Sequence, residues 1–325
     1  MKRALAIALV LLLSVSCRIK SEIYEDILEG AEDAVCWMTP LPDDTPLSRM
    51  SIPGAHDAAT STITSLTLWT KTQDLGIAAL WNCGVRAFDL RPAFVDGRIG
   101  IYHDKYNTNV SFVSVVNGLV AALNTHPGEA AIIIIRHEEE ADGNDPQWST
   151  EMDAFLSSLR SRLVPYHSDI TLGEMRGKIL LLSRNTYLNG PFGGYIKGWT
   201  SSGDLQAQKG VRIEGEDGVE SPLWVQDYYH PNGANDKWQQ VQGMLDATAS
   251  PSGPYPLVIN HTSGYLSDLP DYRSNARNIN SKAADYISQK GTPAGLVMMD
   301  FAGVDRSGGK EVAGLKLVNA LIKNN

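Results

Sequence analysis

The stretch AAIIIIRHE, residues 130–138, is a run of apolar residues that ends abruptly in charged ones. Its length and its β-branched isoleucines are typical of a β-strand. Because apolar and polar residues do not alternate, the strand is predicted to be buried on both faces, as in a parallel sheet covered by helices. The stretch therefore favours an α/β fold.

The same pattern recurs along the chain. Comparable apolar runs are VRAFDLR (85–91), IGIYHD (99–104), KILLLSR (178–184), LWVQDYY (223–229), PLVINHTS (256–263) and GLVMMDF (295–301). Between them lie segments with helical spacing of apolar residues, such as 111–127 and 149–166. Roughly seven or eight such units favour a (β/α) barrel over an open sheet, and no run is followed by a glycine-rich phosphate loop. We expect one catalytic domain.

The N-terminus has the features of a bacterial lipoprotein signal. Lys2 and Arg3 precede an apolar run, 4–13, and small residues lead to Cys17. The run is too short to span a bilayer. We expect removal of residues 1–16, lipidation of Cys17, a tether with a short helix over 17–35, and a barrel over 36–325. The protein is then exported and anchored to a membrane, or secreted if Cys17 is not lipidated.

The overall charge is acidic. The formal net charge of the full chain is −9, and removing residues 1–16 takes away two cations and no acids, which gives −11. Such a body has no electrostatic footprint for nucleic acid. Cys36 and Cys83 remain after the signal, and they either pair or stay free thiols.

Polar side chains follow the apolar runs. Since the carboxyl ends of the strands of a parallel barrel lie at one rim, we expect these side chains to converge there. They are His56, Asp57, Asp89, Arg91, His103, Arg136, His137, Arg184, Asp227, Tyr229 and Asp300.

The composition of this group points to phosphodiester chemistry. Two histidines can serve as general base and general acid, each oriented by a carboxylate. An arginine presents a permanently charged fork to a phosphate. Attack by a neighbouring hydroxyl group would then need no metal or other cofactor.

Seven motifs carry a family resemblance. In chain order they are SIPGAHDAAT (51–60), CGVRAFDLRP (83–92), GIYHDKY (100–106), LGEMRGKILLLSR (172–184), WVQDYY (224–229), INHTS (259–263) and VMMDF (297–301). Their order and spacing resemble bacterial phosphatidylinositol-specific phospholipase C of the X-domain family. The resemblance implies a distorted TIM barrel, cleavage of phosphatidylinositol to diacylglycerol and 1,2-cyclic inositol phosphate, and slow hydrolysis of the cyclic product.

The resemblance also implies catalytic roles. His56 is the expected general base, oriented by Asp300, and His103 is the expected general acid, partnered by Asp57. Arg91 is the expected phosphate clamp. Asp89 completes the residues predicted to take part in catalysis.

A second set of residues is expected to bind inositol. They are Arg184, Asp227 and Tyr229, with Arg136 or His137 in the place of a lysine that the family carries in this motif. The stretch DLR, 89–91, places a cation where calcium-dependent relatives have acidic ligands. This favours the metal-independent branch.

Several interpretations remain open. The chain could instead be a metal-dependent barrel of the glycerophosphodiesterase or sphingomyelinase-D type, or a non-catalytic lipid-binding or glycan-binding barrel. The substrate could be free phosphatidylinositol, a glycosylated anchor or another inositol phospholipid, met at a membrane surface by a monomer. Leu66, Leu68 and Trp69 could enter a membrane interface, but packing of Trp69 on the barrel is favoured. Glu138, Glu139 and Glu140 are expected to form a solvated loop.

Overall fold

The computed structural model describes residues 34–184, 192–200, 208–249, 254–265 and 271–325. The predicted signal and Cys17 lie outside these residues. The described part contains a closed barrel of nine strands. In chain order these are β1 (Ser51–Ala55), β2 (Ala87–Leu90), β6 (Ala131–Ile135), β7 (Ile179–Ser183), β8 (Gly194–Lys197), β9 (Gln208–Gly215), β10 (Glu220–Gln226), β11 (Leu257–His261) and β12 (Gly295–Met299).

The barrel closes between its first and last strands. Ser51 of β1 is in register with Gly295 of β12, and both strands run parallel. The barrel is not parallel throughout, because β9 pairs antiparallel with β8 and with β10. The expectation of an all-parallel sheet is therefore wrong at this side, and the predicted distorted TIM barrel is confirmed.

Burial on both faces explains the unbroken apolar runs. In β6, Ile132 and Ile134 belong to the cluster of side chains inside the barrel. Ile133 and Ile135 belong to the cluster between the strands and the helices. Successive strand residues point to opposite faces, so both faces of this strand require apolar side chains.

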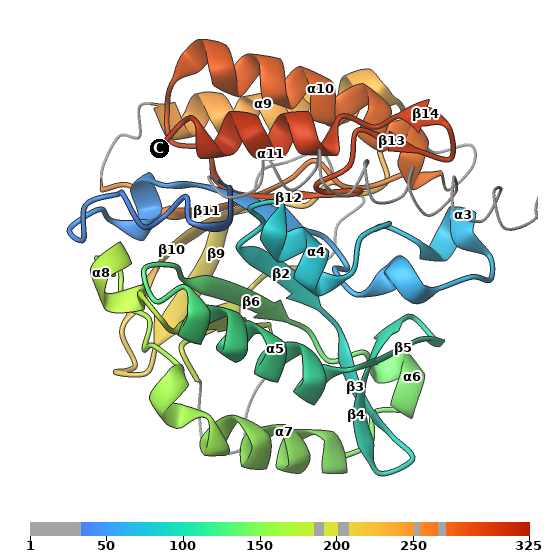
Figure 1. Cartoon of the computed structure of the whole chain (residues 1–325), viewed down its shortest axis with the longest axis vertical. Helices are drawn as coiled ribbons and strands as arrows, with labels where there is room; N and C mark the ends of the chain where they lie inside the picture. Colours follow the sequence, from blue (N-terminus) through green and yellow to red (C-terminus); the bar gives the residue numbers. More distant parts are fainter. Residues whose placement is uncertain (1–33, 185–191, 201–207, 250–253, 266–270) are drawn as a thin grey trace, which may run out of the picture.

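Helices cover the barrel on two opposite sides (Figure 1). α9, α10 and α11 lie together on one side, and α5 and α7 lie on the other. The described helices are α3 (Thr67–Thr70), α4 (Ile77–Asn82), α5 (Phe112–Thr125), α6 (Glu139–Asp142), α7 (Gln147–Ser158), α8 (Leu172–Met175), α9 (Ala234–Ala249), α10 (Tyr272–Lys290) and α11 (Gly314–Ile322), with 3₁₀ turns at Leu47–Arg49, Thr60–Thr62 and Arg160–Arg162. Among these helices, none has the length and apolar character needed to cross a bilayer.

The two predicted helical segments are confirmed with different bounds, since α7 already begins at Gln147. The segment 111–127 forms α5, which begins after the N-cap Ser111. The segment 149–166 contributes most of α7, which ends at Ser158, and a 3₁₀ turn follows.

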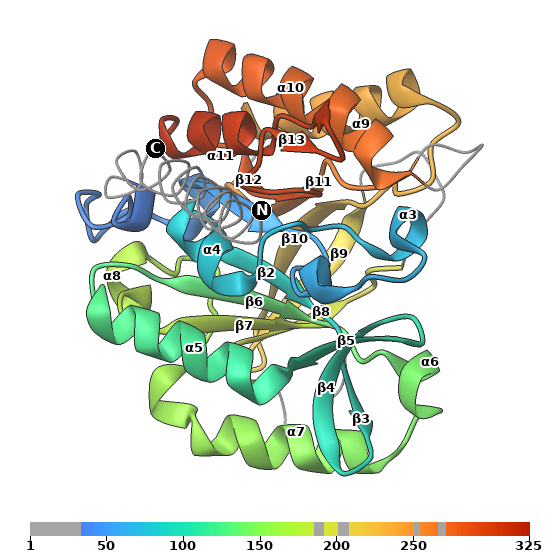
Figure 2. The same cartoon turned by 45° about the vertical axis from the view of Figure 1, so that its right-hand side comes forward.

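One predicted barrel strand belongs elsewhere. Residues 98–103 form β4 (Arg98–His103), the middle strand of a separate antiparallel sheet with β3 (Pro92–Val95) and β5 (Tyr106–Ser111). The turn between β3 and β4 is Asp96–Gly97, and both residues have positive φ, 50° and 72°. Asp-Gly is a strong hairpin signal, because such a turn needs φ above zero at both positions. This small sheet projects beside α6 and α7 (Figure 2).

The structure also tests the expected packing of Trp69 and the open question of a disulfide between Cys36 and Cys83. Leu66, Leu68 and Trp69 are 49%, 55% and 47% exposed, so the interpretation that Trp69 packs on the barrel is wrong. Cys36 and Cys83 are not joined in a disulfide.

A short antiparallel pair, β13 (Arg306–Ser307) and β14 (Lys310–Glu311), follows the last barrel strand. It lies near α10 (Figure 1).

Candidate active site

Eight of the eleven predicted polar side chains line one pocket of about 300 Å³, and Asp89, His137 and Asp300 do not. Most of its lining residues follow the carboxyl ends of barrel strands, where the active site of such barrels lies. The lining residues are His56, Asp57, Arg91, His103, Asp104, Arg136, Arg184, Asp227, Tyr229, Gly264, Tyr265 and Tyr272.

The turn after β1 is bent to present two side chains. Asp57 has a left-handed backbone, φ 41°, which is unusual for a residue other than glycine. Gln73 holds this turn, because its Nε2 donates to the carbonyls of His56, at 2.8 Å, and Met299, at 2.9 Å. Backbone strain that surrounding contacts maintain in this way is typical of functional sites.

His56 is fixed in one orientation. Its Nδ1 lies 2.9 Å from Oδ1 of Asp300, and the other oxygen of Asp300 accepts from the N–H of Gly264 at 3.0 Å. Bonding of Nδ1 to a carboxylate leaves Nε2 toward the pocket as a proton acceptor. Burial lowers the pKa of His56, but Asp57, Asp300 and Asp89 outweigh it and raise this pKa to about 9.

Asp57 is shared by three cationic or potentially cationic groups. Its Oδ1 lies 2.6 Å from Nε of Arg91, and its Oδ2 lies 3.3 Å from Nε2 of His56 and 3.3 Å from Nε2 of His103. Burial raises the pKa of Asp57, but the three partners, Arg91 foremost, hold it far below its usual range. Asp57 is therefore an anion that connects both imidazoles to the guanidinium.

The pKa values of the two histidines are moved apart. Burial lowers the pKa of His103, and Asp57 offsets only part of that effect. His56 therefore holds a proton more tightly than His103, and the form with a neutral His56 and a protonated His103 is a minor protonation state of this centre. Pairs of titratable groups whose pKa values are moved apart are a feature of acid–base sites.

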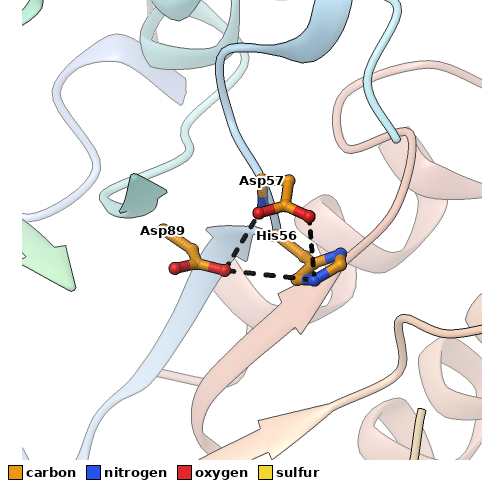
Figure 3. A group of neighbouring side chains, drawn as sticks. All are labelled: His56, Asp57 and Asp89. Carbon is orange, nitrogen blue, oxygen red and sulfur yellow. Dashed lines mark hydrogen bonds and ion pairs between the residues drawn. The ribbon is translucent and has the colours of Figure 1, made fainter. Parts of the chain in front are cut away.

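Arg91 lies among carboxylates that could otherwise hold a cation. His56, Asp57 and Asp89 place ligand atoms within 4.8 Å of one another, and Figure 3 shows these three side chains facing each other at the ends of β1 and β2. Nη2 of Arg91 lies 3.3 Å from Nε2 of His56 and 4.0 Å from Oδ2 of Asp89. Since Nε of Arg91 also contacts Asp57, the guanidinium touches all three of these residues.

Glu138 completes the surroundings of Arg91. The expectation that Glu138 is solvated is wrong: it is 2% exposed, and its Oε2 lies 3.7 Å from Nη1 of Arg91. Burial raises the pKa of Glu138 to about 7, against the effect of Arg91. Glu139 and Glu140 are exposed in α6, as expected.

The opposite wall combines charge with aromatic rings. The guanidinium of Arg184 lies over the ring of Trp199, 3.9 Å from its centroid, and Nε1 of Trp199 donates to Asp227 at 3.0 Å. The ring centroids of Tyr229 and Tyr265 are 6.0 Å apart. Charged hydrogen-bonding groups beside aromatic faces suit a polyhydroxylated ring.

Comparisons with known proteins cover most of the chain. No protein-family model matches it. A 1-phosphatidylinositol phosphodiesterase from Listeria monocytogenes is 28% identical over 287 residues, which cover 82% of this chain and 80% of that protein. One from Staphylococcus aureus is 23% identical over 288 residues, which cover 82% and 88%.

Solved structures agree. A phosphatidylinositol-specific phospholipase C variant from Staphylococcus aureus matches with a TM-score of 0.75 at 21% identity, over 89% of this chain and 98% of that one. The corresponding Listeria monocytogenes enzyme matches with a TM-score of 0.68 at 22% identity, over 90% and 98%. The predicted resemblance to bacterial phosphatidylinositol-specific phospholipase C is confirmed.

The structure separates Arg136 from His137, the two candidates for the lysine position of the phospholipase C motif. Arg136 lines the pocket. His137 turns away from it, with Nε2 2.7 Å from Asp142 and its ring stacked on Trp148 at 4.1 Å. Arg136 is therefore the candidate that reaches the pocket. The expectation that His137 could bind inositol there is wrong, because its side chain lies outside the pocket.

Sequence reasoning missed several residues in or beside this phospholipase C-like pocket. His261 ends β11, so the rule that found the other rim residues would also have found it. Its ring lies 5.7 Å from that of His56, centroid to centroid. Tyr265 and Tyr272 line the pocket from outside the strands, and no periodic pattern marks such positions.

Proposed function

We propose that this chain is a phosphatidylinositol diacylglycerol-lyase, an enzyme that cleaves phosphatidylinositol or a glycosylated relative. The observation that carries the proposal is the linked set of His56, His103 and Arg91 around Asp57. The names of the curated relatives support the same reaction.

The reaction follows from the placement of these groups. The inositol 2-hydroxyl gives its proton to Nε2 of His56 as its oxygen attacks phosphorus. Arg91 holds the phosphate oxygens and balances the charge that develops on them. The bond from phosphorus to the diacylglycerol oxygen breaks, and that oxygen takes a proton from His103. The products are diacylglycerol and 1,2-cyclic inositol phosphate. In a slower second step, water takes the place of diacylglycerol and hydrolyses the cyclic product.

The reaction as proposed needs no metal ion. Arg91 contacts each member of the group His56, Asp57 and Asp89, so a divalent cation there would meet a guanidinium. This observation favours the proposal over a metal-dependent glycerophosphodiesterase-like barrel.

One experiment tests the proposed function directly. Purified protein is incubated with phosphatidylinositol micelles in excess EDTA, and the products are followed by phosphorus NMR. Appearance of cyclic inositol phosphate is expected. Activity that disappears in EDTA and returns with a divalent ion would favour the metal-dependent alternative, and a lack of turnover under every condition would favour a binding protein.

The rate should depend on pH through both histidines. The reactive form has His56 unprotonated and His103 protonated, while the pKa of His56 is raised to about 9 and the pKa of His103 is lowered. We therefore expect kcat/KM to rise at low pH as His103 titrates and to fall above about pH 9 as His56 titrates. Asp300→Asn removes one of the charges that raise the pKa of His56, so the falling limb should move to lower pH. Rates measured from pH 5 to 10 for both proteins check this, and an unshifted falling limb would contradict the assignment of His56 as base.

We propose that the enzyme contacts the membrane surface through Leu66, Leu68 and Trp69. These exposed side chains lie at α3, and α3 contacts α10, whose first residue, Tyr272, lines the pocket. Exposed tryptophan and leucine next to a pocket suit a lipid interface. We further propose that the enzyme acts as a monomer and does not bind nucleic acid, since its formal net charge of −9 gives no electrostatic footprint for a polyanion.

The double variant Leu68→Ala/Trp69→Ala should bind vesicles containing phosphatidylinositol at least about tenfold more weakly, because it removes apolar area from the interface. Vesicle sedimentation measures this. Hydrolysis of soluble cyclic inositol phosphate serves as the control and should change little. Equal vesicle binding by the variant and the wild type would rule out this surface.

Export and anchoring through Cys17 are proposed from the sequence alone. Cys17→Ala in the full-length chain should release the protein from the membrane fraction, because it removes the lipid attachment point. A variant that stays fully bound after fractionation would show that Cys17 is not the anchor.

A further inference from the structure

A lysine is buried beneath the wall that carries Asp227 and Tyr229. Lys237 lies in the first turn of α9 and is 0% exposed. Its Nζ donates to the carbonyl of Tyr228 at 2.6 Å and to Oε1 of Gln226 at 3.4 Å. Gln226 is the last residue of β10, and Tyr228 lies in the segment that leads from β10 into the pocket.

Gln226 extends this connection to the neighbouring strand β11. Its Oε1 also accepts from the N–H of Tyr228 at 2.8 Å. Its Nε2 donates to Oδ1 of Asn260 at 2.8 Å and to the carbonyl of His261 at 2.7 Å. Lys237 and Gln226 together therefore hold the ends of β10 and β11 in a fixed relation.

Charge supports the same arrangement. Burial lowers the pKa of Lys237 to about 7, while Asp227 and Asp300 act in the opposite direction. Burial raises the pKa of Asp227, but His261, Arg184 and Lys237 outweigh it and keep that pKa low. The ammonium thus helps to keep Asp227 ionised from behind, out of reach of a ligand in the pocket.

An ordinary core position would not need this residue. Burying an ammonium group is unfavourable unless it is hydrogen-bonded and offset by opposite charge. The proposed reaction gives Lys237 no role, since it does not line the pocket. The shorter of its hydrogen bonds instead holds the carbonyl of Tyr228, which lies between two pocket residues, Asp227 and Tyr229.

We infer that Lys237 is a positioning residue for recognition of the substrate headgroup: through Tyr228 and Gln226 it fixes the segment that presents Asp227 and Tyr229 to the inositol ring. This inference rests on the proposed function. It assigns Lys237 to binding of the headgroup and not to proton transfer or phosphate stabilisation, which lie on the side of His56 and Arg91.

The test compares Lys237→Met with Met244→Ala. Met244 is 0% exposed on the same helix, so its truncation weakens the packing of α9 without touching the hydrogen bonds to Tyr228 and Gln226. For each protein we would measure the thermal midpoint, kcat and KM on phosphatidylinositol, and the inhibition constant of myo-inositol.

Lys237→Met is expected to raise KM and the inhibition constant of myo-inositol by about tenfold, with kcat changed by less than about threefold. Met244→Ala is expected to lower the thermal midpoint with both constants unchanged. Lys237→Gln, which keeps an N–H donor toward the Tyr228 carbonyl, should recover part of the affinity and keeps the test decisive if Lys237→Met does not fold.

A double variant adds a second criterion. Combined with Asp227→Asn, Lys237→Met should raise the inhibition constant little beyond Asp227→Asn alone, because the two residues act through the same contact. The inference would be overturned if folded Lys237 variants kept the wild-type KM and inhibition constant of myo-inositol. It would also be overturned if Met244→Ala raised these two constants as much as Lys237→Met does. A wild-type protein that neither cleaves phosphatidylinositol nor binds myo-inositol would overturn the proposed function itself.

Discussion

His56→Ala and His103→Ala are each expected to lose about 10²–10⁴-fold in kcat while remaining folded. His56→Ala removes the acceptor of the hydroxyl proton, which Asp300 orients at 2.9 Å. His103→Ala removes the donor to the leaving oxygen, so the alkoxide of diacylglycerol would have to depart unprotonated. Steady-state kinetics on phosphatidylinositol, with circular dichroism as the folding check, measures both losses.

A surface histidine provides the control for these two variants. His167 pairs with Glu174 at 3.0 Å, and its side chain is 43% exposed. His167→Ala should retain the wild-type rate. If either His56→Ala or His103→Ala kept more than about a tenth of that rate, equivalent to a barrier change below about 1.4 kcal/mol, its role in proton transfer would have to be reassigned.

Arg91→Lys is expected to be nearly as damaging although it keeps the charge. The guanidinium contacts Asp57 through Nε while its terminal nitrogens lie near Asp89, Glu138 and His56. An ammonium is a point charge that cannot satisfy these directions and also bind two phosphate oxygens. A loss of about 10²–10³-fold is expected, mainly in kcat, because the interaction strengthens as charge develops in the transition state.

Wild type and Arg91→Lys should be assayed with and without EDTA, beside a second variant, Arg91→Asp. That variant replaces the guanidinium with a carboxylate next to Asp57, Asp89 and Glu138, and oxygen ligands are what calcium prefers. Of these three proteins, only Arg91→Asp is expected to show weak activity that depends on calcium. Near-full activity of Arg91→Lys, or a wild type that needs calcium, would show that Arg91 is not the phosphate clamp.

Much of the pocket could be predicted because the carboxyl ends of the parallel barrel strands lie at the same rim, so residues that follow different strands in the sequence lie close together in space. His56, Arg136 and Arg184 each follow a strand that ends at the same rim, so their convergence follows from the apolar runs alone. The same rule would have added His261.

The remaining errors have physical causes that sequence periodicity does not report. His103 reaches the pocket from the hairpin strand β4 and not from the barrel, and a short apolar run looks the same in both settings. Glu138 looked solvated because it begins a run of three acids, but Arg91, far from it in sequence, provides a buried partner. The antiparallel strand β9 depends on pairing with its neighbours, which no local pattern encodes.

The sharing of Asp57 among His56, His103 and Arg91 means that this centre has no independent ionisation constants. A proton taken up by one imidazole changes the field at the other through the same carboxylate. The two limbs of a pH–rate curve then describe macroscopic constants of the whole assembly. Replacing any one member moves both limbs, so the contributions of the three partners to catalysis will not sum.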